Sequence, residues 1–228
     1  MDRKNGDIVE RAIVALTAGE PILIHDFEDR ENETDLVIAA SKMTHTLIAR
    51  FRNEAGGLIC VAISDEASEV LGLPFLSDMI DHPLTENSDL KYDTRSAFSL
   101  PVNHRDTYTG ITDIDRETTI KRLAEVAYSA ESGEYTAEQF VKEFRSPGHV
   151  QILRSAPSLK ERRGHTELGI ALAKAAGMEP AVVVCEMLDD VSGKASSKAE
   201  IQEYAEKNGL LFIEGKMLVE ALEGNPNK

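Results

Sequence analysis

An acid-rich segment between two apolar runs constrains the fold of this chain more than any other feature. Residues 26–35 read DFEDRENETD and hold six acids and one arginine. The letters ILI precede this segment and LVIAA follow it, so we expect two buried strands joined by an acidic loop. If the second strand begins a few residues early, its period of two places Glu31, Glu33 and Asp35 on one side. These carboxylates repel one another unless a cation or a polyhydroxylated substrate lies among them; a hydrated acidic turn is the alternative.

A second segment places basic and polar residues at the start of a helix. Residues 161–167 read ERRGHTE, and residues 168–177 after them have helical periodicity and end in glycine. Unpaired backbone N–H groups, the helix dipole and arginine side chains together suit an anion such as a phosphate. His165 adds an imidazole, the usual nitrogen partner of carboxylates around a divalent ion. The alternative is that Thr166 or Glu167 only caps the helix and His165 lies at the surface.

Five segments, in one order along the chain, resemble the 3,4-dihydroxy-2-butanone 4-phosphate synthase family. Residues 26–35 resemble its D-x-x-x-R-E-G-E-x-D signature, with Asn32 in place of a glycine. The run RRGHTE resembles R-x-G-H-T-E, and the phosphate-binding arginine is either Arg162 or Arg163. The other three segments are AGGLIC from residue 55, FRSPGHV from residue 144, and an apolar strand that ends in Cys185-Glu186.

Asn32 is the clear departure from the family signature. Glycine suits a backbone position of positive φ, and asparagine tolerates that region best after glycine. We therefore expect a positive φ at Asn32 and an unchanged backbone path through the loop. The alternative is an ordinary extended residue whose amide reaches solvent or substrate.

The resemblance implies a carbon–carbon lyase of riboflavin biosynthesis. Such an enzyme converts D-ribulose 5-phosphate to L-3,4-dihydroxy-2-butanone 4-phosphate and formate, through a metal-stabilised enediolate and a skeletal rearrangement. The implied cofactor is Mg²⁺ or Mn²⁺, with two ions per site, because a hard cation suits a developing oxyanion. The family also implies a homodimer with sites at the interface. We expect the monofunctional form, a single synthase domain over residues 1–228.

The resemblance also assigns residues to the metal and to the substrate. Glu31 and His165 match the metal ligands, and Glu33 is placed at a metal-bound water. Arg30 and Asp35 are expected to hold sugar hydroxyls. Arg162, Gly164 and Thr166 are expected to bind the phosphate. The full expected substrate-binding set is Asp26, Arg30, Glu31, Asp35, Thr112, Arg162, Arg163, Gly164, His165 and Thr166.

Several proton transfers at different atoms require more than one acid or base, and four residues are candidates. Glu186 ends an apolar strand, where desolvation raises a carboxyl pKa towards neutrality. His149 follows a Pro-Gly turn, and the alternative to a catalytic role is that it only caps the start of the next strand. Glu33 and Cys60 complete the catalytic set, with packed core as the alternative for Cys60.

The formal net charge of −15 limits the partners of this chain. Nucleic acid and acidic membranes would be repelled, so an anionic substrate must meet a local positive pocket. No apolar run approaches the roughly 18 residues of a membrane span, and the first residues lack an apolar signal core. We therefore expect a cytoplasmic protein, with Cys60 and Cys185 as buried free thiols.

The predicted helices and strands neither alternate strictly nor segregate. We therefore expect an α+β fold, a three-layer single domain with a mixed β-sheet between helices. Residues 78–95 are polar and aperiodic, and we expect this loop to close as a lid over bound substrate. Strands are predicted at 22–25, 36–40, 58–63, 97–102, 150–153, 181–187 and 210–213, and helices at 8–18, 44–55, 65–72, 115–130, 136–144, 166–176, 197–208 and 216–222.

Two other classes of protein would use similar residues. A metal-dependent phosphosugar isomerase or aldolase would need the same carboxylates, histidine and phosphate site, but it would release no formate. A binding module without catalysis is disfavoured, because six acids near the ligand would oppose the binding of an anion.

Overall fold

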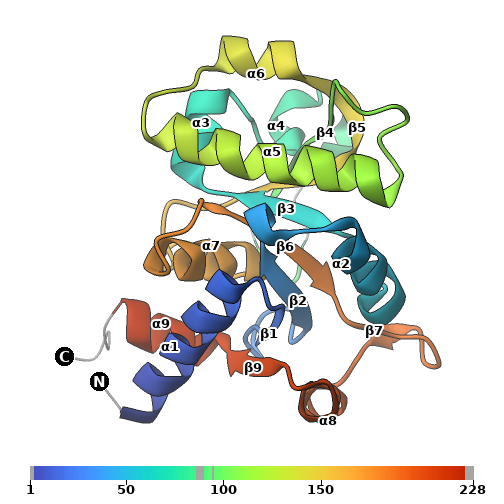
Figure 1. Ribbon diagram of the computed structural model, residues 1–228. Helices are drawn as coiled ribbons and strands as arrows, with labels where there is room; N and C mark the ends of the chain where they lie inside the picture. Colours follow the sequence, from blue (N-terminus) through green and yellow to red (C-terminus); the bar gives the residue numbers. More distant parts are fainter. Residues whose placement is uncertain (1–2, 86–89, 94, 224–228) are drawn as a thin grey trace.

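A mixed β-sheet lies between two layers of helices in the computed structural model, which describes residues 3–85, 90–93 and 95–223 (Figure 1). Within these residues the sheet has seven strands in the order β4-β5-β3-β6-β2-β1-β9. The β1/β9 and β3/β5 pairs are parallel, and the other neighbouring pairs are antiparallel. The strands are β1 (Ile22–His25), β2 (Thr34–Ala39), β3 (Cys60–Ile63), β4 (Phe98–His104), β5 (Phe144–Arg154), β6 (Ala181–Glu186) and β9 (Leu211–Glu214). The three-layer fold with a mixed sheet, expected from the sequence, is confirmed.

The helices divide between the two faces of the sheet. One core contains residues of α2 (His45–Arg50), α3 (Asp65–Leu71), α5 (Asp113–Glu131), α6 (Ala137–Glu143) and α8 (Lys198–Asn208). The other contains residues of α1 (Arg3–Ala18), α7 (His165–Ala175) and α9 (Gly215–Leu222). Helices α1 and α9 lie side by side (Figure 1). Shorter helical segments are α4 (Leu76–Met79), the π-helix η2 (Phe51–Ala55) and the 3₁₀ helices η1 (Ala40–Lys42) and η3 (Pro83–Thr85).

Alternate residues of strand β2 pack in the two cores on opposite faces of the sheet. All six of its residues are buried. Leu36 and Ile38 pack in the core that includes α5, whereas Val37 and Ala39 pack in the core that includes α7. Because successive strand residues point to opposite faces, an uninterrupted apolar run is what a strand covered on both faces requires.

Some boundaries differ from the predicted ones. Strand β2 begins at Thr34, so Asp35 lies in the strand while Glu31 and Glu33 remain in the loop. Strand β5 begins six residues before the predicted Val150, because β4 supplies a partner as far as Phe144. A hairpin of β7 (Leu188–Asp189) and β8 (Lys194–Ala195) was not predicted, because two-residue strands carry no periodicity.

The predicted lid, residues 78–95, is described only in part. It includes the end of α4 and η3, while residues 86–89 and 94 lie outside the described residues. Closure over the substrate therefore remains a prediction.

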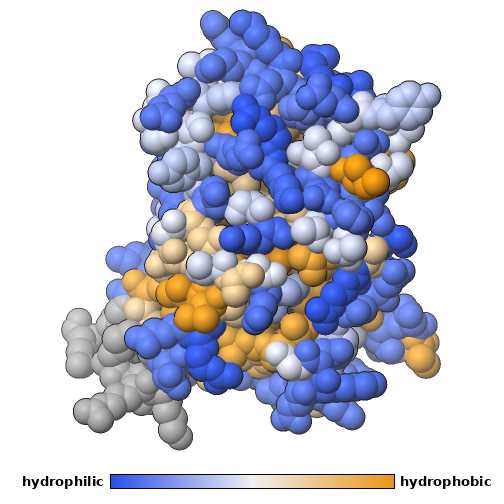
Figure 2. All heavy atoms as spheres, viewed as in Figure 1, coloured by the Kyte–Doolittle hydropathy of each residue, from blue (hydrophilic) through white to orange (hydrophobic). Residues whose placement is uncertain are grey.

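The surface agrees with the charge of the sequence. Most of the face in Figure 2 is hydrophilic, as a net charge of −15 predicts. Cys60 and Cys185 are both free and buried, as expected. In the described part of the chain, no helix has the length and apolar character needed to cross a membrane.

Candidate active site

Asp26 organises the acidic loop between β1 and β2. Its Oδ1 accepts a hydrogen bond from the Glu33 N–H at 3.0 Å, and its Oδ2 accepts one from the Glu31 N–H at 3.2 Å. The Arg30 guanidinium donates to the same Oδ2 at 3.0 Å. Both oxygens of Asp26, a predicted substrate residue, are thus engaged within the loop, where they fix its shape.

Asn32 lies in the turn of this loop. Its φ is 56°, in the left-handed region, as predicted from the substitution of asparagine for glycine. The N–H groups of Arg30 and Asn32 both donate to the Phe27 carbonyl, at 2.9 and 3.2 Å. The turn therefore sets the direction in which Glu31 leaves the loop.

Glu31, Asp35 and His165 meet beside this turn. The His165 Nδ1 lies 3.2 Å from Glu31 Oε2 and 3.7 Å from Asp35 Oδ1. Its Nε2 lies 3.2 Å from the Glu33 carbonyl oxygen. Among the described residues, Asp26, Glu31 and His165 form a group whose ligand atoms lie within 4.8 Å of one another. The two predicted metal ligands, Glu31 and His165, are therefore neighbours.

Burial and mutual charge govern protonation in this cluster. Burial would lower the pKa of His165, but Asp35, Glu31 and Asp26 outweigh it and raise that pKa to about 9. Burial would raise the pKa of Glu31, but His165 and Arg30 hold it down to about 2. For Asp35, burial dominates and raises the pKa. The positive charges of His165 and Arg30 therefore offset part of the negative charge of this cluster.

Arg30 and Arg162 lie at the N-terminus of α7. The N–H of Gly164, the residue before the helix, donates to Glu167 Oε2 at 3.0 Å. A Cβ atom at residue 164 would lie 2.7 Å from Arg30 Nη2 and 2.8 Å from Arg162 Nη1, so glycine is needed for both guanidinium groups to approach. Thr166 is buried in the first turn of the helix. Two guanidinium groups and a helix N-terminus form an anion site.

Arg163 points elsewhere. Its guanidinium lies 4.4 Å from the Phe27 ring centroid, and its Nη2 is 3.8 Å from Asp29 Oδ2. Of the two arginines that the sequence left open, only Arg162 lines the cavity described next.

One cavity of about 130 Å³ joins the acidic cluster to the anion site. Glu186, at the end of β6, lines it and accepts a hydrogen bond from the Leu58 N–H at 2.8 Å. A Cβ atom at residue 57 would collide with the Glu186 carboxylate, which explains the second glycine of the AGGLIC run. Cys60 forms part of the wall, and burial raises the pKa of its thiol. The predicted site residues that line the cavity are Arg30, Glu31, Asp35, Cys60, Arg162, His165, Thr166 and Glu186.

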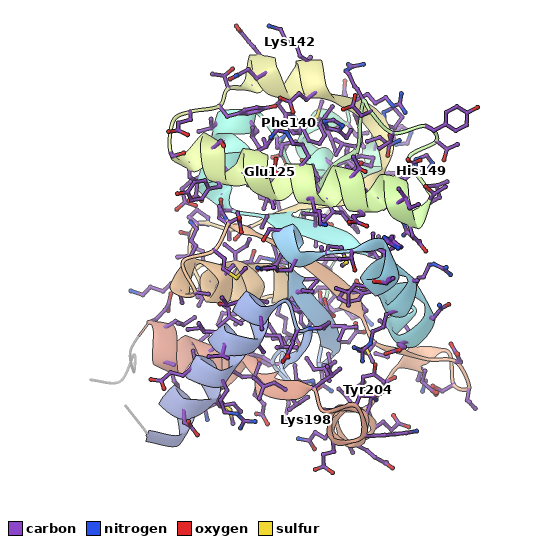
Figure 3. All side chains as sticks on the ribbon, viewed as in Figure 1. Glu125, Phe140, Lys142, His149, Lys198 and Tyr204 are labelled. Carbon is purple, nitrogen blue, oxygen red and sulfur yellow. The ribbon has the colours of Figure 1, made fainter. Side chains whose placement is uncertain are left out.

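His149 and Thr112 do not line this cavity. The His149 N–H donates to the Asn103 side-chain oxygen Oδ1 at 2.8 Å, and its Nδ1 lies 3.1 Å from Asn103 Nδ2. Thr112 caps α5 by accepting from the Asp115 N–H at 3.2 Å. Figure 3 shows His149 near one end of α5. These two predicted residues therefore belong to a second polar cluster.

Comparison with known proteins identifies the family. The family model described as 3,4-dihydroxy-2-butanone 4-phosphate synthase matches residues 10–221. The chain belongs to the 3,4-dihydroxy-2-butanone 4-phosphate synthase family. It is 50% identical over 224 residues to the synthase of Methanosarcina mazei, covering 93% of this chain and 90% of the relative. The synthase of Archaeoglobus fulgidus is 49% identical over 221 residues, covering 92% of each chain.

Solved structures of the synthase family have the same fold. A 3,4-dihydroxy-2-butanone 4-phosphate synthase in complex with two magnesium ions superposes with a TM-score of 0.74 at 31% identity. The match covers 95% of this chain and 98% of that structure. The synthase of Candida albicans gives the same TM-score at 31% identity, covering 93% of this chain and 95% of that structure. Members of the family convert ribulose 5-phosphate in riboflavin biosynthesis.

Two charged residues at this synthase site were not predicted from the sequence. Asp93 Oδ2 lies 2.6 Å from Arg162 Nε, and Glu167 Oε2 lies 2.7 Å from Arg162 Nη1. The sequence pattern predicts only a capping role for Glu167, because its position gives no sign of a neighbouring arginine. Asp93 lies in the polar loop before β4, where one acid among several carries no distinguishing signal.

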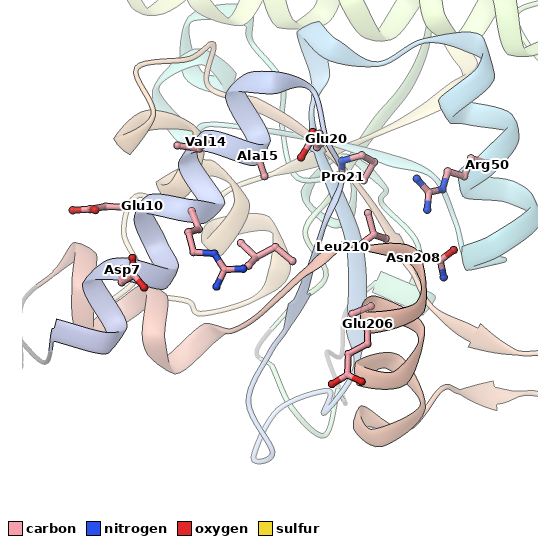
Figure 4. Close-up of a pocket in the computed structure, with 14 residues that line it drawn as sticks. Asp7, Glu10, Val14, Ala15, Glu20, Pro21, Arg50, Glu206, Asn208 and Leu210 are labelled. Carbon is pink, nitrogen blue, oxygen red and sulfur yellow. The ribbon is translucent and has the colours of Figure 1, made fainter.

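A larger groove of about 820 Å³ lies elsewhere in this synthase fold, between α1 and the turn from α8 to β9 (Figure 4). It is open to solvent and contains none of the predicted site residues. The candidate active site is therefore identified by its converging titratable groups and not by the volume of the cavity. The charged residues of the groove are Asp7, Glu10, Arg11, Glu20, Arg50 and Glu206.

Proposed function

We propose that this chain converts D-ribulose 5-phosphate to L-3,4-dihydroxy-2-butanone 4-phosphate and formate at the cavity between Glu31 and Arg162. The observation that carries the proposal is the meeting of a carboxylate–histidine cluster and an arginine-flanked helix N-terminus in one cavity. The carboxylate–histidine end of the cavity matches the hydroxyl and keto groups of the substrate, and the arginine end matches its phosphate.

The phosphate is assigned to the N-terminus of α7. Arg162 and Arg30 supply charge-assisted hydrogen bonds, and the N–H groups and hydroxyl of the first turn, including Thr166, supply further donors. Binding of the phosphate orients the reacting carbons towards Glu31 and Asp35. The binding energy of a group that does not react is thus used to position the groups that do.

A divalent cation is assigned to Glu31 and His165. Among the described residues, the buried Asp35 Oδ1 atom beside His165 has no hydrogen-bond partner, so the cluster offers a further oxygen ligand. Carboxylate oxygens with one imidazole nitrogen suit Mg²⁺, with Mn²⁺ as the alternative. When bound, the ion would stabilise negative charge that develops on substrate oxygens as a carbon-bound proton leaves. The related structure with two magnesium ions supports two ions per site.

Proton transfer is assigned to carboxyl groups of the cavity. Glu186 is half-buried, lines the cavity and is the proposed acid–base group, while Asp35 is 3% exposed and burial raises its pKa to about 7. A bound cation would hold Asp35 as a carboxylate, so Asp35 keeps the sugar contacts and Glu186 the proton transfer. Burial and Glu31 raise the pKa of Glu33, which remains the candidate partner of a metal-bound water. Cys60 enters the proposal as a neutral part of the wall.

A homodimer with shared sites would give His149 and Thr112 a place in the reaction. The loop that leads to Thr112 and the first turn of α5 expose large apolar side chains, with Tyr108 93%, Ile111 50% and Ile114 66% exposed. Figure 2 shows a hydrophobic group among hydrophilic residues beside the end of α5. Exposed apolar residues around a polar cluster suit a contact with a second copy. We therefore place His149 and Thr112 at the partner's cavity.

Residues 1–228 are proposed to form one domain, because β1 and β9, close to the two ends of the sequence, pair within a single sheet. A cytoplasmic location is also proposed, and the two free thiols agree with a reducing compartment.

Formation of formate separates this proposal from a phosphosugar isomerase or aldolase. The purified protein is incubated with ribulose 5-phosphate and magnesium, and the products are followed by carbon NMR. We expect formate and a four-carbon phosphate. No formate above a metal-free control would overturn the proposed function.

A further inference from the structure

Asp93 bridges the two arginines to which the phosphate is assigned. A single oxygen, Oδ2, lies 2.6 Å from Arg162 Nε and 3.3 Å from Arg30 Nη2. The side chains of Arg30 and Asp93 are 9% and 11% exposed, so water screens this contact little. One anionic oxygen shared by two guanidinium groups is the arrangement that a phosphate oxygen would adopt at the same place.

Glu167 holds Arg162 from the other side in a different way. Its Oε2 accepts from Arg162 Nη1 at 2.7 Å and from the Gly164 N–H, while its Oε1 accepts from the Ala156 N–H at 2.9 Å. The Glu167 side chain is 2% exposed and belongs to α7. Two backbone N–H groups thus anchor the Glu167 carboxylate, and α7 fixes its backbone. We therefore expect Glu167 to stay in contact with Arg162 when substrate binds.

Asp93 reaches the arginines from a loop. It lies outside any helix or strand, and its carboxylate contacts both guanidinium groups through Oδ2. It also lines a neighbouring cleft of about 420 Å³, together with Arg95 and Arg154. This cleft gives the Asp93 side chain a space to enter when it leaves Arg30 and Arg162. Its lining also includes Asp65 and Glu69, which pair with Arg154.

Substrate and Asp93 therefore compete for the same donors. The Asp93 oxygen lies between Arg162 Nε and Arg30 Nη2, so a phosphate oxygen that bridges the same two nitrogens takes its position. Asp93 thus occupies Arg30, the second arginine of the anion site, as well as Arg162. A phosphate dianion carries more charge than a carboxylate and is the stronger ligand for two guanidinium groups.

We propose that the Asp93 carboxylate is a removable substitute for the substrate's phosphate. In the empty enzyme it holds Arg30 and Arg162 in position and neutralises them, and it leaves when the sugar phosphate binds. Asp93 is thereby a positioning residue that also lowers the affinity for phosphate-bearing ligands. The inference rests on the proposed function for the assignment of the phosphate to Arg30 and Arg162.

Asp93→Asn tests the competition, with Asp93→Ser as a second variant. Calorimetric titration with inorganic phosphate, in buffer with a metal chelator, reads the anion site without turnover. We expect both variants to bind phosphate on the order of tenfold more tightly than the unaltered protein, because the competing charge is gone. The KM for ribulose 5-phosphate should fall by a similar factor, with a smaller change in kcat.

Asp81→Asn is the matched control. It removes the same charge from the same polar loop, and Asp81 is exposed. Its phosphate affinity and KM should equal those of the unaltered protein, which excludes an effect of net charge alone.

Opposite results would overturn the inference. If Asp93 is instead a permanent support for Arg162, both variants will bind phosphate more weakly and KM will rise. Unchanged affinity in both variants also excludes competition. If the unaltered protein makes no formate, the proposed function fails, while the phosphate titrations still decide whether Asp93 competes for the anion.

Discussion

Asn32 links a single backbone angle to the position of two carboxylates. Its φ of 56° is one that a β-branched residue resists, whereas glycine adopts it freely. We predict that Asn32→Gly stays active and that Asn32→Val loses most activity, because the turn that directs Glu31 towards His165 changes shape. Rates of formate release, with far-ultraviolet circular dichroism as the check on folding, measure this. Full activity of a folded valine variant would refute the proposed role of this turn.

Glu31 and His165 are expected to be the groups whose loss the enzyme tolerates least. Their contact of 3.2 Å places both at the proposed cation, and loss of one ligand to a weakly held divalent ion is costly. We predict that Glu31→Gln and His165→Asn lower turnover at least about 100-fold and weaken binding of magnesium or manganese by calorimetry. Glu28→Gln is the control, because Glu28 is an exposed acid of the same loop. Normal turnover of either ligand variant at saturating magnesium would contradict the assignment.

The predicted site residues that the structure brings together belong to short motifs. Glu31, His165 and Glu186 belong to this group, and the structure places all three at one cavity. Asp93 escapes prediction because its partners, Arg30 and Arg162, lie 63 and 69 residues away. No local pattern reports a contact over that separation. The choice between Arg162 and Arg163 is open in the sequence for the same reason. Arg163 contacts the ring of Phe27, a residue far away in the sequence.

At the level of helices and strands, prediction works where burial imposes a period. The apolar run 181–187 predicts β6 to within one residue, and helix α7 begins one residue before its predicted start. The first half of β5 is missed because Pro147 and Gly148 are typical of turns. In the structure β4 pairs on both sides of them, and the extra residues between the partners of Val102 and Asn103 lie in β5. Tertiary pairing, which a local pattern does not contain, decides that segment.

A hydrogen bond of Glu117 links helices α2 and α5, and the charge of Glu117 should affect the stability of the fold. Glu117 on α5 accepts from the His45 N–H at 2.6 Å and from Lys121 Nζ at 2.7 Å. Burial would raise the pKa of Glu117, but Lys121 and His45 lower it from 4.5 to about 2. A lowered folded-state pKa means stabilisation that is complete above about 4.5 and is lost as pH falls through about 2.

The prediction is that Glu117→Gln lowers the free energy of unfolding at pH 7 and that the difference disappears as pH approaches 2. Because the Glu117 side chain is partly exposed, at 21%, salt should reduce the difference. Urea unfolding at a series of pH values measures both effects. A difference that grows as the pH falls would contradict the expected sign of the pH dependence.

On the scale of the whole molecule, a chain of net charge −15 has to bind an anionic substrate. We propose that Arg30 and Arg162, which converge at a helix N-terminus, meet this demand locally. His149 and Thr112 lie in a second polar cluster of the same chain, flanked by exposed apolar residues. A homodimer that brings the second cluster of one chain to the cavity of the other would complete two sites.

Mixing two inactive variants tests this shared site. When Glu31→Gln and His149→Asn proteins are unfolded together and refolded, half of the dimers should be mixed, each with one intact site. We predict recovery of about a quarter of the normal activity, as expected for a symmetric pair. A mixture of Glu31→Gln with His165→Asn is the control and should stay inactive, because both changes damage the same cavity. No recovery in the first mixture would exclude a shared site.

The conversion of ribulose 5-phosphate is central to every role assigned above, and the balance of carbon between substrate and products tests it most directly. Ribulose 5-phosphate labelled with carbon-13 at every position is incubated with the purified protein and magnesium, and the reaction is followed by NMR. We predict one formate and one four-carbon phosphate for each ribulose 5-phosphate consumed, and no reaction once a chelator removes the metal. Consumption of substrate without formate, or formate that forms equally well with the chelator present, would contradict the proposed conversion.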